Sequence, residues 1–364
     1  MLKRLISVLV VLLIVVIGIR MVFVKSVNEV VPSVNTSLVD DELISTSGLD
    51  TKTELPCYSP LERETYSINV PVTTLWKEPN QDREVDSYAT SSVSNMKEWT
   101  EVMTLPEKQW LVGKIETQAL YGQEVTILSK SGEWYEIAVK DQYTPKNKTG
   151  YPGWVPKNHI AQMSQNYAEC KVAIVSEPSI EMYSDRTLKE HFIDVSFNTT
   201  LPIIEEDKEL LHVQTPVDGV KFIRKSDVKI VASGAEVPKP TENDIVNTAK
   251  EFLGLPYLWA GTSGFGYDCS GFTYSVYKQH GITLPRDSTV QATSGTAVSI
   301  ADLKPGDLMF YSHDKGKGNV HHVSMYIGEG LMIHSPNPKK TVEIVSIDLA
   351  QFKSEFSGAR RYLK

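Results

Sequence analysis

Cys269 stands between a glycine-rich stretch and a run that can begin a helix, in the sequence Gly261-Thr-Ser-Gly-Phe-Gly-Tyr-Asp-Cys-Ser-Gly-Phe. A free cysteine has a pKa of about 8.5, so little of it is thiolate at neutral pH, but a helix N-terminus or an adjacent imidazolium favours the anion. Phe272, Val276 and Tyr277 have helical spacing, which predicts that Cys269 opens a helix and faces its backbone N–H groups. Cys269 is therefore a candidate nucleophile. A lone cysteine is more often a small buried hydrophobic residue, so its partners must decide.

Two histidines on neighbouring predicted strands supply a candidate base and a group to orient it. The stretch from Asn319 to Ser335 predicts two strands joined by a tight turn centred on Glu329. Strand alternation then places His334 diagonally from His322 on one face, about 7–8 Å away at the backbone, while His321 points to the other face. A cysteine, a histidine base and a polar residue that orients the base form a catalytic chain. For either histidine, packing in the core is the alternative.

Four motifs around these residues resemble the NlpC-type bacterial cell-wall peptidases, papain-like enzymes that cut stem peptides. They are Tyr267-Asp-Cys-Ser-Gly-Phe, Leu303-Lys-Pro-Gly-Asp-Leu, His322-Val-Ser-Met-Tyr-Ile-Gly and Ile333-His. The resemblance covers roughly Thr241 to Tyr362, and it implies that Cys269, His322 and His334 are the catalytic residues. The chain is also similar to the branch that carries two SH3-like modules before the peptidase and acts as a γ-D-glutamyl-L-diamino-acid endopeptidase.

The same resemblance implies a site for the free α-amine of the substrate. In the resembling branch an aspartate and a serine bind this amine, and they fall on Asp287 and Ser288. The first module of that branch packs against the peptidase and narrows its cleft, which implies that Glu116 and Tyr151 line the N-terminal end of the substrate. Alternatively, Asp287 or Ser288 caps a helix that begins at Thr289, and Glu116 and Tyr151 are a surface carboxylate and a half-buried tyrosine.

Three residues near the cysteine are further predicted substrate contacts. Ser270 directly follows the candidate nucleophile. Tyr257 and Trp259 precede the glycine-rich stretch, where their rings could wall the cleft. Burial of these two rings for packing is equally expected.

Neither a metal nor a cofactor is expected. His321 and His322 are adjacent and face opposite ways, there is no His-Glu-x-x-His pattern, and the three cysteines lack zinc-type spacing. The 37 basic and 45 acidic residues give a net charge of −8, which argues against nucleic acid as a partner. The expected partners are murein peptides or peptidoglycan, and a membrane through the N-terminal segment.

The N-terminal residues predict export. Met1-Leu-Lys-Arg is a basic leader, and the run from Leu5 to Val24 has no charge apart from Arg20 and is long enough to cross a bilayer. We predict a signal anchor over residues 1–24, with a cleaved signal peptide as the alternative, and a tether over residues 25–54. The rest of the chain is then outside the cytoplasm, either membrane-anchored and facing the cell wall or secreted.

Short alternating strands predict two SH3-like modules ahead of the peptidase. Gly122 to Val139 alternates around a Ser-Gly turn, so we place a first module at residues 55–165, with an inserted helical segment from Val85 to Trp110. A weaker copy of four or five short strands occupies residues 166–234. These modules bind the wall or are merely structural.

The predicted fold class is therefore α+β, with a papain-like peptidase domain at residues 241–364, two small all-β SH3-like barrels before it, and a membrane segment at the N-terminus. Cys57 and Cys170 either pair or remain independent buried thiols. The predicted reaction is hydrolysis of the γ-D-glutamyl-L-diamino acid bond of murein stem peptides with a free N-terminal L-Ala, by a Cys-His-His mechanism. The alternatives are an endopeptidase that acts on intact peptidoglycan and a non-catalytic wall-binding protein.

Overall fold

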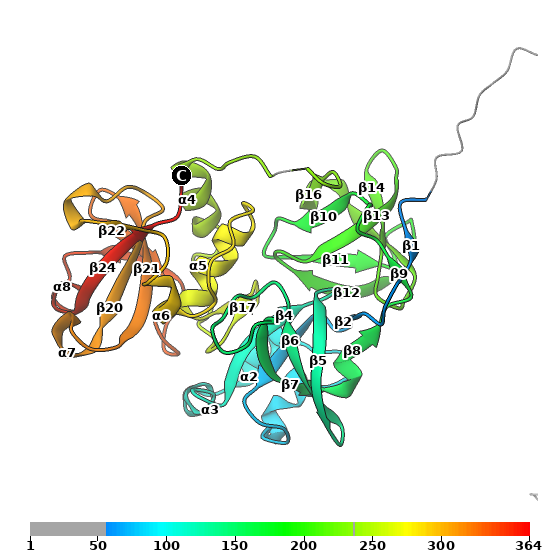
Figure 1. Ribbon diagram of the computed structural model, residues 1–364, viewed down its shortest axis with the longest axis horizontal. Coiled ribbons are helices and arrows are strands. Elements are labelled where there is room, and N and C mark those ends of the chain that lie inside the picture. Colours follow the sequence, from blue (N-terminus) through cyan, green and yellow to red (C-terminus); the bar gives the residue numbers. More distant parts are fainter. Residues whose placement is uncertain (1–55, 236) are drawn as a thin grey trace, which may run out of the picture. The chain divides into compact units, whose positions relative to one another are not determined.

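The computed structural model describes residues 56–235 and 237–364, which contain two β-modules and an α/β domain (Figure 1). The predicted membrane segment over residues 1–24 and the tether over residues 25–54 lie outside these ranges. Within the described ranges, no helix is long and apolar enough to cross a membrane.

The first module is a seven-stranded antiparallel sheet of order β4-β3-β7-β6-β5-β2-β8. Its strands are β2 (Tyr66–Ile68), β3 (Val72–Trp76), β4 (Ile115–Leu120), β5 (Glu124–Ser131), β6 (Trp134–Val139), β7 (Tyr151–Pro156) and β8 (Ile160–Gln162). A helical segment between β3 and β4 contains η1 (Glu84–Asp86), α1 (Ser87–Thr90), α2 (Met96–Val102) and α3 (Leu105–Trp110), and η2 (Lys157–His159) precedes β8. Trp99 of this segment is fully buried with Trp76 of β3, so the helices extend the core of the module.

The second module is also a seven-stranded antiparallel sheet, of order β12-β11-β15-β14-β13-β10-β16. Its elements are β10 (Val172–Val175), β11 (Ser179–Tyr183), β12 (His191–Ser196), β13 (Thr200–Glu206), β14 (Leu210–Gln214), β15 (Val220–Arg224), η3 (Lys225–Asp227) and β16 (Val228–Val231). The strand order repeats that of the first module, strand for strand. Our estimate of four or five strands was too low, because it left out β11 and β12.

A short strand pair and a disulfide join the start of the described chain to the second module. β1 (Ser59–Pro60) pairs with β9 (Gln165–Asn166), and a disulfide links Cys57 to Cys170 across 113 positions. The two cysteines therefore pair, and Cys269 is the free cysteine of the described residues.

The C-terminal domain is built on a six-stranded antiparallel sheet of order β19-β24-β20-β21-β22-β23. Its strands are β19 (Thr296–Val298), β20 (Leu308–Ser312), β21 (Val320–Gly328), β22 (Leu331–His334), β23 (Glu343–Ser346) and β24 (Phe356–Arg361), with the separate hairpin β17 (Thr262–Ser263) and β18 (Gly266–Tyr267). Its helices are α4 (Glu242–Lys250), α5 (Cys269–Lys278), α6 (Ser288–Gln291), η4 (Ile300–Asp302), α7 (His313–Gly316) and α8 (Ala350–Glu355).

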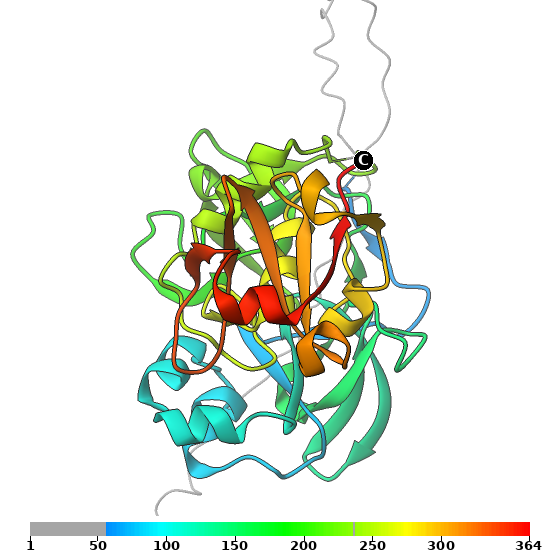
Figure 2. The same ribbon diagram turned by 90° about the vertical axis from the view of Figure 1, so that its left-hand side faces the viewer.

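Alternation along the strands gives this sheet two different apolar faces. Phe310 and Val323 belong to one buried cluster with residues of α4 and α5, whereas Met309 and Tyr311 pack on the other face with Phe352 of α8. Figure 2 shows α8 crossing the outer side of the strands.

The hairpin of β21 and β22 has the predicted register. Met325 pairs with Ile333, so position 324 faces position 334. The turn consists of Gly328, Glu329 and Gly330, all with positive φ, of 97°, 53° and 71°. His322 and His334 consequently occupy the same face of neighbouring strands.

Candidate active site

Cys269 is the first residue of α5, and the residue before it caps the helix. The carboxylate of Asp268 accepts a hydrogen bond of 2.6 Å from the N–H of Gly271. A Cβ at Gly271 would collide with the carbonyl oxygen of Gly261, and one at Gly264 with that of Pro178 in the second module. The glycines around the cysteine therefore allow close backbone packing, and none of these three has a positive φ.

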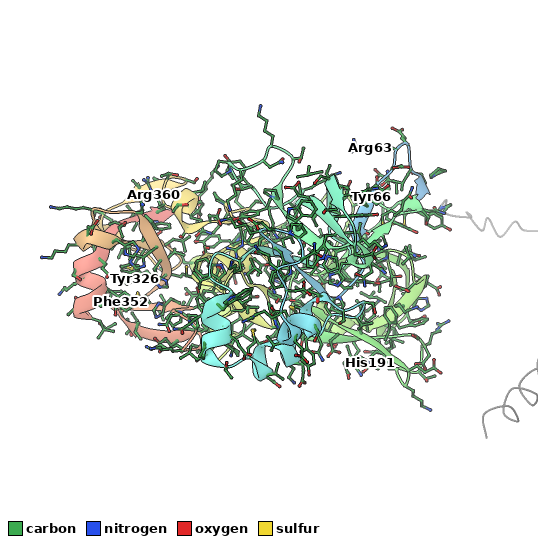
Figure 3. All side chains as sticks on the ribbon, turned by 90° about the horizontal axis from the view of Figure 1, so that it is seen from below. Arg63, Tyr66, His191, Tyr326, Phe352 and Arg360 are labelled. Carbon is green, nitrogen blue, oxygen red and sulfur yellow. A yellow bond between two sulfur atoms is a disulfide. The ribbon has the colours of Figure 1, made fainter. Side chains whose placement is uncertain are left out.

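The two histidines are joined directly. Nε2 of His322 lies 2.8 Å from Nδ1 of His334, and both rings are buried. The ring of Phe352 in α8, which Figure 3 labels, has its centroid 6.4 Å from that of His322 and 5.3 Å from that of His334. Within the described residues, the other ring nitrogen of His322, Nδ1, makes no hydrogen bond.

Glu343 adds a third member to the contact between His322 and His334, and the sequence analysis assigned it no role. It pairs directly with His334 between β22 and β23, and its Oε1 lies 3.5 Å from Nε2 of His334. Nε2 is buried and makes no hydrogen bond within the described residues. The sequence analysis did not predict the strand β23, so it did not predict that Glu343 pairs with His334.

Burial of the Cys269 thiol opposes the ionisation that a helix N-terminus favours. Burial and then the Asp268 carboxylate raise the pKa of Cys269 to about 12, partly offset by a backbone hydrogen bond from Val323, the residue after His322. Burial likewise lowers the pKa of His322 well below its usual range. The free enzyme therefore holds a neutral thiol and a neutral imidazole, because burial outweighs the favourable dipole of the helix.

Arg286 fixes the loop that precedes α6 to the start of α5. Its side chain is buried and makes a bidentate ion pair with Asp268, at 2.8 and 3.2 Å. It also donates to Ser270 Oγ at 2.9 Å and to Thr117 Oγ1 of the first module at 2.9 Å. The hydroxyl of Ser270, a predicted substrate contact, is thus already bonded within the protein.

Residues of the first module and of the C-terminal domain meet at Asp287. Tyr151 donates its hydroxyl to the two carboxylate oxygens of Asp287, at 3.0 and 3.1 Å, and Glu116 Oε2 lies 3.3 Å from the same hydroxyl. Asp287 occupies the N-cap position of α6 but makes no capping bond, and Ser288 is the half-buried first residue of that helix. Burial and the charge of Asp287 raise the pKa of Tyr151 far above its usual range, so it remains a donor.

Lys146 reaches the same group from the loop between β6 and β7. Its Nζ donates to Tyr151 Oη at 2.6 Å and to Glu116 Oε2. Sequence reasoning missed Lys146, because a lysine in a polar loop carries no signal of its partners.

The two predicted aromatic contacts lie in different surroundings. Tyr257 is buried, and burial is the main cause that raises its pKa well above the ordinary value. Trp259 donates its indole N–H to the carbonyl of Ile115 at 3.1 Å and packs on the core of the first module. Trp259 therefore helps to dock the two domains.

Comparisons with known proteins agree with this organisation. Residues 254–361 match the model of the NlpC/P60 family, and residues 175–230 match that of the YKFC SH3b2 domain. A γ-D-glutamyl-L-lysine dipeptidyl-peptidase of Bacillus cereus is 45% identical over 301 residues, which are 81% of this chain and 90% of that protein. The chain belongs to the NlpC/P60 family of cysteine peptidases.

A second relative and a solved structure also cover most of the chain. A γ-D-glutamyl-L-lysine dipeptidyl-peptidase of Bacillus subtilis is 38% identical, over 80% of this chain and 96% of that one. The crystal structure of an NlpC/P60 family protein from Bacillus cereus superposes with a TM-score of 0.78 at 44% identity, over 82% of this chain and 100% of that one. The match therefore includes the modules as well as the family domain.

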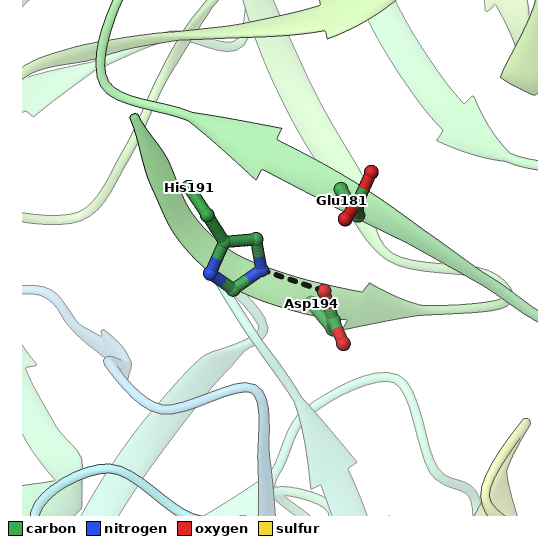
Figure 4. Close-up of side chains that lie close together, drawn as sticks. All are labelled: Glu181, His191 and Asp194. Atoms are coloured by element: carbon green, nitrogen blue, oxygen red, sulfur yellow. Dashed lines mark hydrogen bonds and ion pairs between the residues drawn. The ribbon is translucent and has the colours of Figure 1, made fainter. Parts of the chain in front are cut away.

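Two groups in the described residues have the composition of metal ligands, and both belong to the second module of this NlpC/P60 protein. The first is the exposed group Glu181, His191 and Asp194 (Figure 4). The second is Glu205, Asp207 and His212, in which both ring nitrogens of the histidine already contact carboxylates, at 3.2 and 3.0 Å. Neither group includes a residue of the Cys269 site.

Proposed function

We propose that this protein is a γ-D-glutamyl-L-diamino-acid endopeptidase that acts on murein stem peptides with a free N-terminal L-alanine. The observation that carries the proposal is the bond between Tyr151 of the first module and Asp287 of the peptidase domain, beside a second carboxylate, Glu116. An ammonium group is what two carboxylates and a phenol oxygen bind well. The names of the two Bacillus relatives support the choice of bond.

The contacts among Glu343, His334 and His322 favour the tautomer in which Nδ1 of His322 can act as the base. The Glu343 carboxylate accepts only, so it favours the proton of His334 on Nε2. Nδ1 of His334 then accepts from Nε2–H of His322, and Nδ1 of His322 keeps its lone pair for the thiol proton of Cys269.

Catalysis then proceeds from a neutral pair. His322 removes the proton of Cys269 as the sulfur attacks the γ-glutamyl carbonyl carbon, and it returns this proton to the leaving amine of the diamino acid. Water releases the acyl group from the sulfur in the second half of the reaction. Backbone N–H groups at the start of α5 hold the oxyanion, and a well-placed donor contributes about 3–4 kcal/mol.

Recognition of the amine selects the state of the substrate. In intact wall the alanine nitrogen is part of an amide, so it lacks the positive charge and the three N–H donors that an ammonium group would offer to Asp287 and Glu116. A released peptide has both. The proposed substrate is therefore a released stem peptide rather than the intact wall.

We further propose that the protein works outside the cytoplasm, anchored by residues 1–24. The basic leader and apolar run support export. So does the Cys57–Cys170 disulfide, since such bonds persist mainly in oxidising compartments.

The test is product identification by mass spectrometry. The full-length protein is incubated with L-Ala-γ-D-Glu-L-Lys, with the corresponding diaminopimelate peptide, and with purified intact wall. We expect L-Ala-D-Glu and the free diamino acid from the peptides, and no products with Cys269→Ser. Products from intact wall alone would favour the alternative of a wall endopeptidase, and no products from any substrate would favour a wall-binding protein.

A further inference from the structure

Lys146 holds its own ammonium group among the acceptors proposed for the substrate amine. Nζ of Lys146 donates to Glu116 and, at 2.6 Å, to Tyr151, and it lies 4.6 Å from the centre of the tyrosine ring. In the part of the chain that the structure describes, Glu116 is its only ion-pair partner. The ammonium group of Lys146 thus occupies the site that we propose for the α-amine of the substrate.

The hydrogen bonds of Tyr151 leave no room for a second ammonium at its oxygen. A phenol has one proton to donate, and Tyr151 directs it to Asp287. Its oxygen accepts from Lys146, and the contact with Glu116 at 3.3 Å adds no further acceptor on the phenol. An incoming amine that bonds to this oxygen must therefore replace Lys146.

The charges of the site lead to the same conclusion. Glu116 and Asp287 are two anions, and the nearby charge of Arg286 is already matched by Asp268. With Lys146 in place, a substrate amine would bring a second cation against the first. Exchange of one ammonium for the other keeps the balance of charge and leaves every acceptor bonded.

Lys146 is also placed so that it can leave. It lies in the loop of residues 140–150, and 43% of its side chain is exposed. Its long stem lets the ammonium return to water without movement of the strands, and an exposed ion pair of this kind is weak.

We infer that Lys146 is a specificity-determining residue that fills the amine site of the free enzyme and is displaced by the α-amine of the substrate. This inference rests on the proposed function. Because Lys146 fills the site for part of the time, the apparent affinity for the substrate amine equals the intrinsic affinity multiplied by the fraction of time for which the site is open. Because the exchange precedes the chemical steps, it raises KM for free-amine peptides and leaves kcat unchanged.

The experiment measures binding of the dipeptide L-Ala-γ-D-Glu by isothermal titration calorimetry. The full-length chain carries Cys269→Ala, which prevents turnover, and is compared with versions that add Lys146→Met, Lys146→Arg or Lys148→Met. Lys148 is a matched control because it lies in the same loop and has the same charge. A parallel assay measures kcat and KM of Lys146→Met in the active protein with L-Ala-γ-D-Glu-L-Lys.

We expect Lys146→Met to bind the dipeptide about three- to tenfold more tightly, as for a site that is open about 10–30% of the time. Lys146→Arg keeps a cation and should stay close to the parent, and so should Lys148→Met. In the active protein KM should fall by a similar factor at constant kcat.

Three results overturn the inference. If Lys146→Met binds the dipeptide equally or more weakly, Lys146 stays in place or contacts the substrate itself. If Lys148→Met tightens binding as much as Lys146→Met, the effect is one of general charge. If the parent itself neither binds the dipeptide nor cleaves the tripeptide, the proposed function fails and the inference fails with it.

Discussion

The two SH3-like modules have one strand order but contact the peptidase domain in different ways. Their strands correspond residue by residue: Leu120 ends β4 opposite Val72, the first residue of β3, and Ser196 ends β12 opposite Ser179, the first residue of β11. This correspondence allows each residue of the first module to be compared with a counterpart in the second.

The residue that follows β4 in the first module, and the one that follows β12 in the second, each pack into the core of the next domain along the chain. Tyr121 packs into the core of the second module, and Phe197 packs into the core of the peptidase domain, 4.9 Å from Phe252. The next residues, Gly122 and Asn198, have φ of 77° and 68°, a conformation that glycine and asparagine tolerate best. Each module is thus joined to the next part of the chain by one buried ring.

The modules differ on the face and in the loop that reach the active site. Gln118 of β4 accepts from Thr262 and Ser263 of the peptidase hairpin, at 3.1 and 3.0 Å. Its counterpart in the second module is Asp194, which is exposed in the group of Figure 4. At this position the same framework therefore carries a docked, buried residue in the first module and an exposed, charged one in the second.

The strand that carries Tyr151 shows the same contrast. Tyr151 begins β7 and Val220 begins β15, and each pairs with the last residue of the preceding strand. Tyr151 is 1% exposed and bonded to Asp287, whereas Val220 is 39% exposed. The loop before Tyr151 spans residues 140–150, and the loop before Val220 spans residues 215–219. Loops and side chains, rather than the sheet, make the first module part of the site.

The largest expected effect is a loss of stability, without a loss of catalysis, on substitution of Phe197 in the second module. Phe197→Ala removes a fully buried ring and should lower the free energy of unfolding by about 3–5 kcal/mol in urea denaturation, while kcat/KM per folded molecule stays unchanged. Val217→Ala, at an exposed site of the same module, is the control and should change stability by less than about 0.5 kcal/mol. A stable Phe197→Ala protein with altered substrate selection would reverse the roles assigned to the modules.

The next largest effect is a pH-dependent loss of stability that arises from His159 of the first module. His159 is buried between Thr73 Oγ1 and the carbonyl of Ser91, at 2.7 Å each, and burial lowers its pKa to about 4; its counterpart is Asp227. The unfolded chain binds a proton below about pH 6.5 and the folded chain does not, so stability is complete above pH 6.5 and falls as the pH drops towards 4.

Urea unfolding at pH 7 and pH 4.5 tests this assignment. The loss of stability of the unsubstituted protein on acidification should exceed that of His159→Gln by about 2–3 kcal/mol, at about 1.4 kcal/mol per pKa unit. Equal losses in the two proteins would mean that His159 is not the titrating group.

A smaller effect compares corresponding residues of the two modules. Tyr151→Phe removes the hydroxyl that bonds Asp287 and should lower kcat/KM for L-Ala-γ-D-Glu-L-Lys by about tenfold, the value of a hydrogen bond of about 1–1.5 kcal/mol. Val220→Ala should leave kcat/KM unchanged. Equal kinetics of the two variants would show that the first module contributes nothing specific to the site.

The smallest effect separates positioning of the base from recognition of the amine. Glu343→Gln keeps the size of the side chain but removes the charge that fixes the His334 proton, so kcat should fall by about three- to tenfold. The loss should be the same for free and N-acetylated tripeptides, and the acid limb of the kcat profile should move. A change in KM for the free peptide alone would place Glu343 at the substrate instead.

Local patterns in the sequence predicted the positions of Cys269, His322 and His334 well. Helical spacing after Cys269 and strand alternation around the Glu329 turn are short-range signals, so the helix start and the strand register follow from them. The fold class follows similarly, with the two β-modules and the NlpC/P60 domain present.

The rest depends on contacts between distant residues. The bonds of Lys146, Glu343 and Arg286 join segments that no periodicity connects, and a single sequence does not show such pairs. The raised pKa of Cys269 was also beyond the reach of the sequence, because the degree of burial that causes it arises only when α5 packs on the sheet.

The most direct test of the account compares kcat/KM for L-Ala-γ-D-Glu-L-Lys and its N-acetylated form, with the unsubstituted protein and with Asp287→Ala. Acetylation removes the charge that Asp287 is proposed to bind, and loss of a charge-assisted hydrogen bond of about 2–5 kcal/mol should lower kcat/KM at least about 30-fold. Asp287→Ala should erase most of this difference. Equal values for the two peptides with the unsubstituted protein would contradict amine recognition and favour cleavage of intact wall.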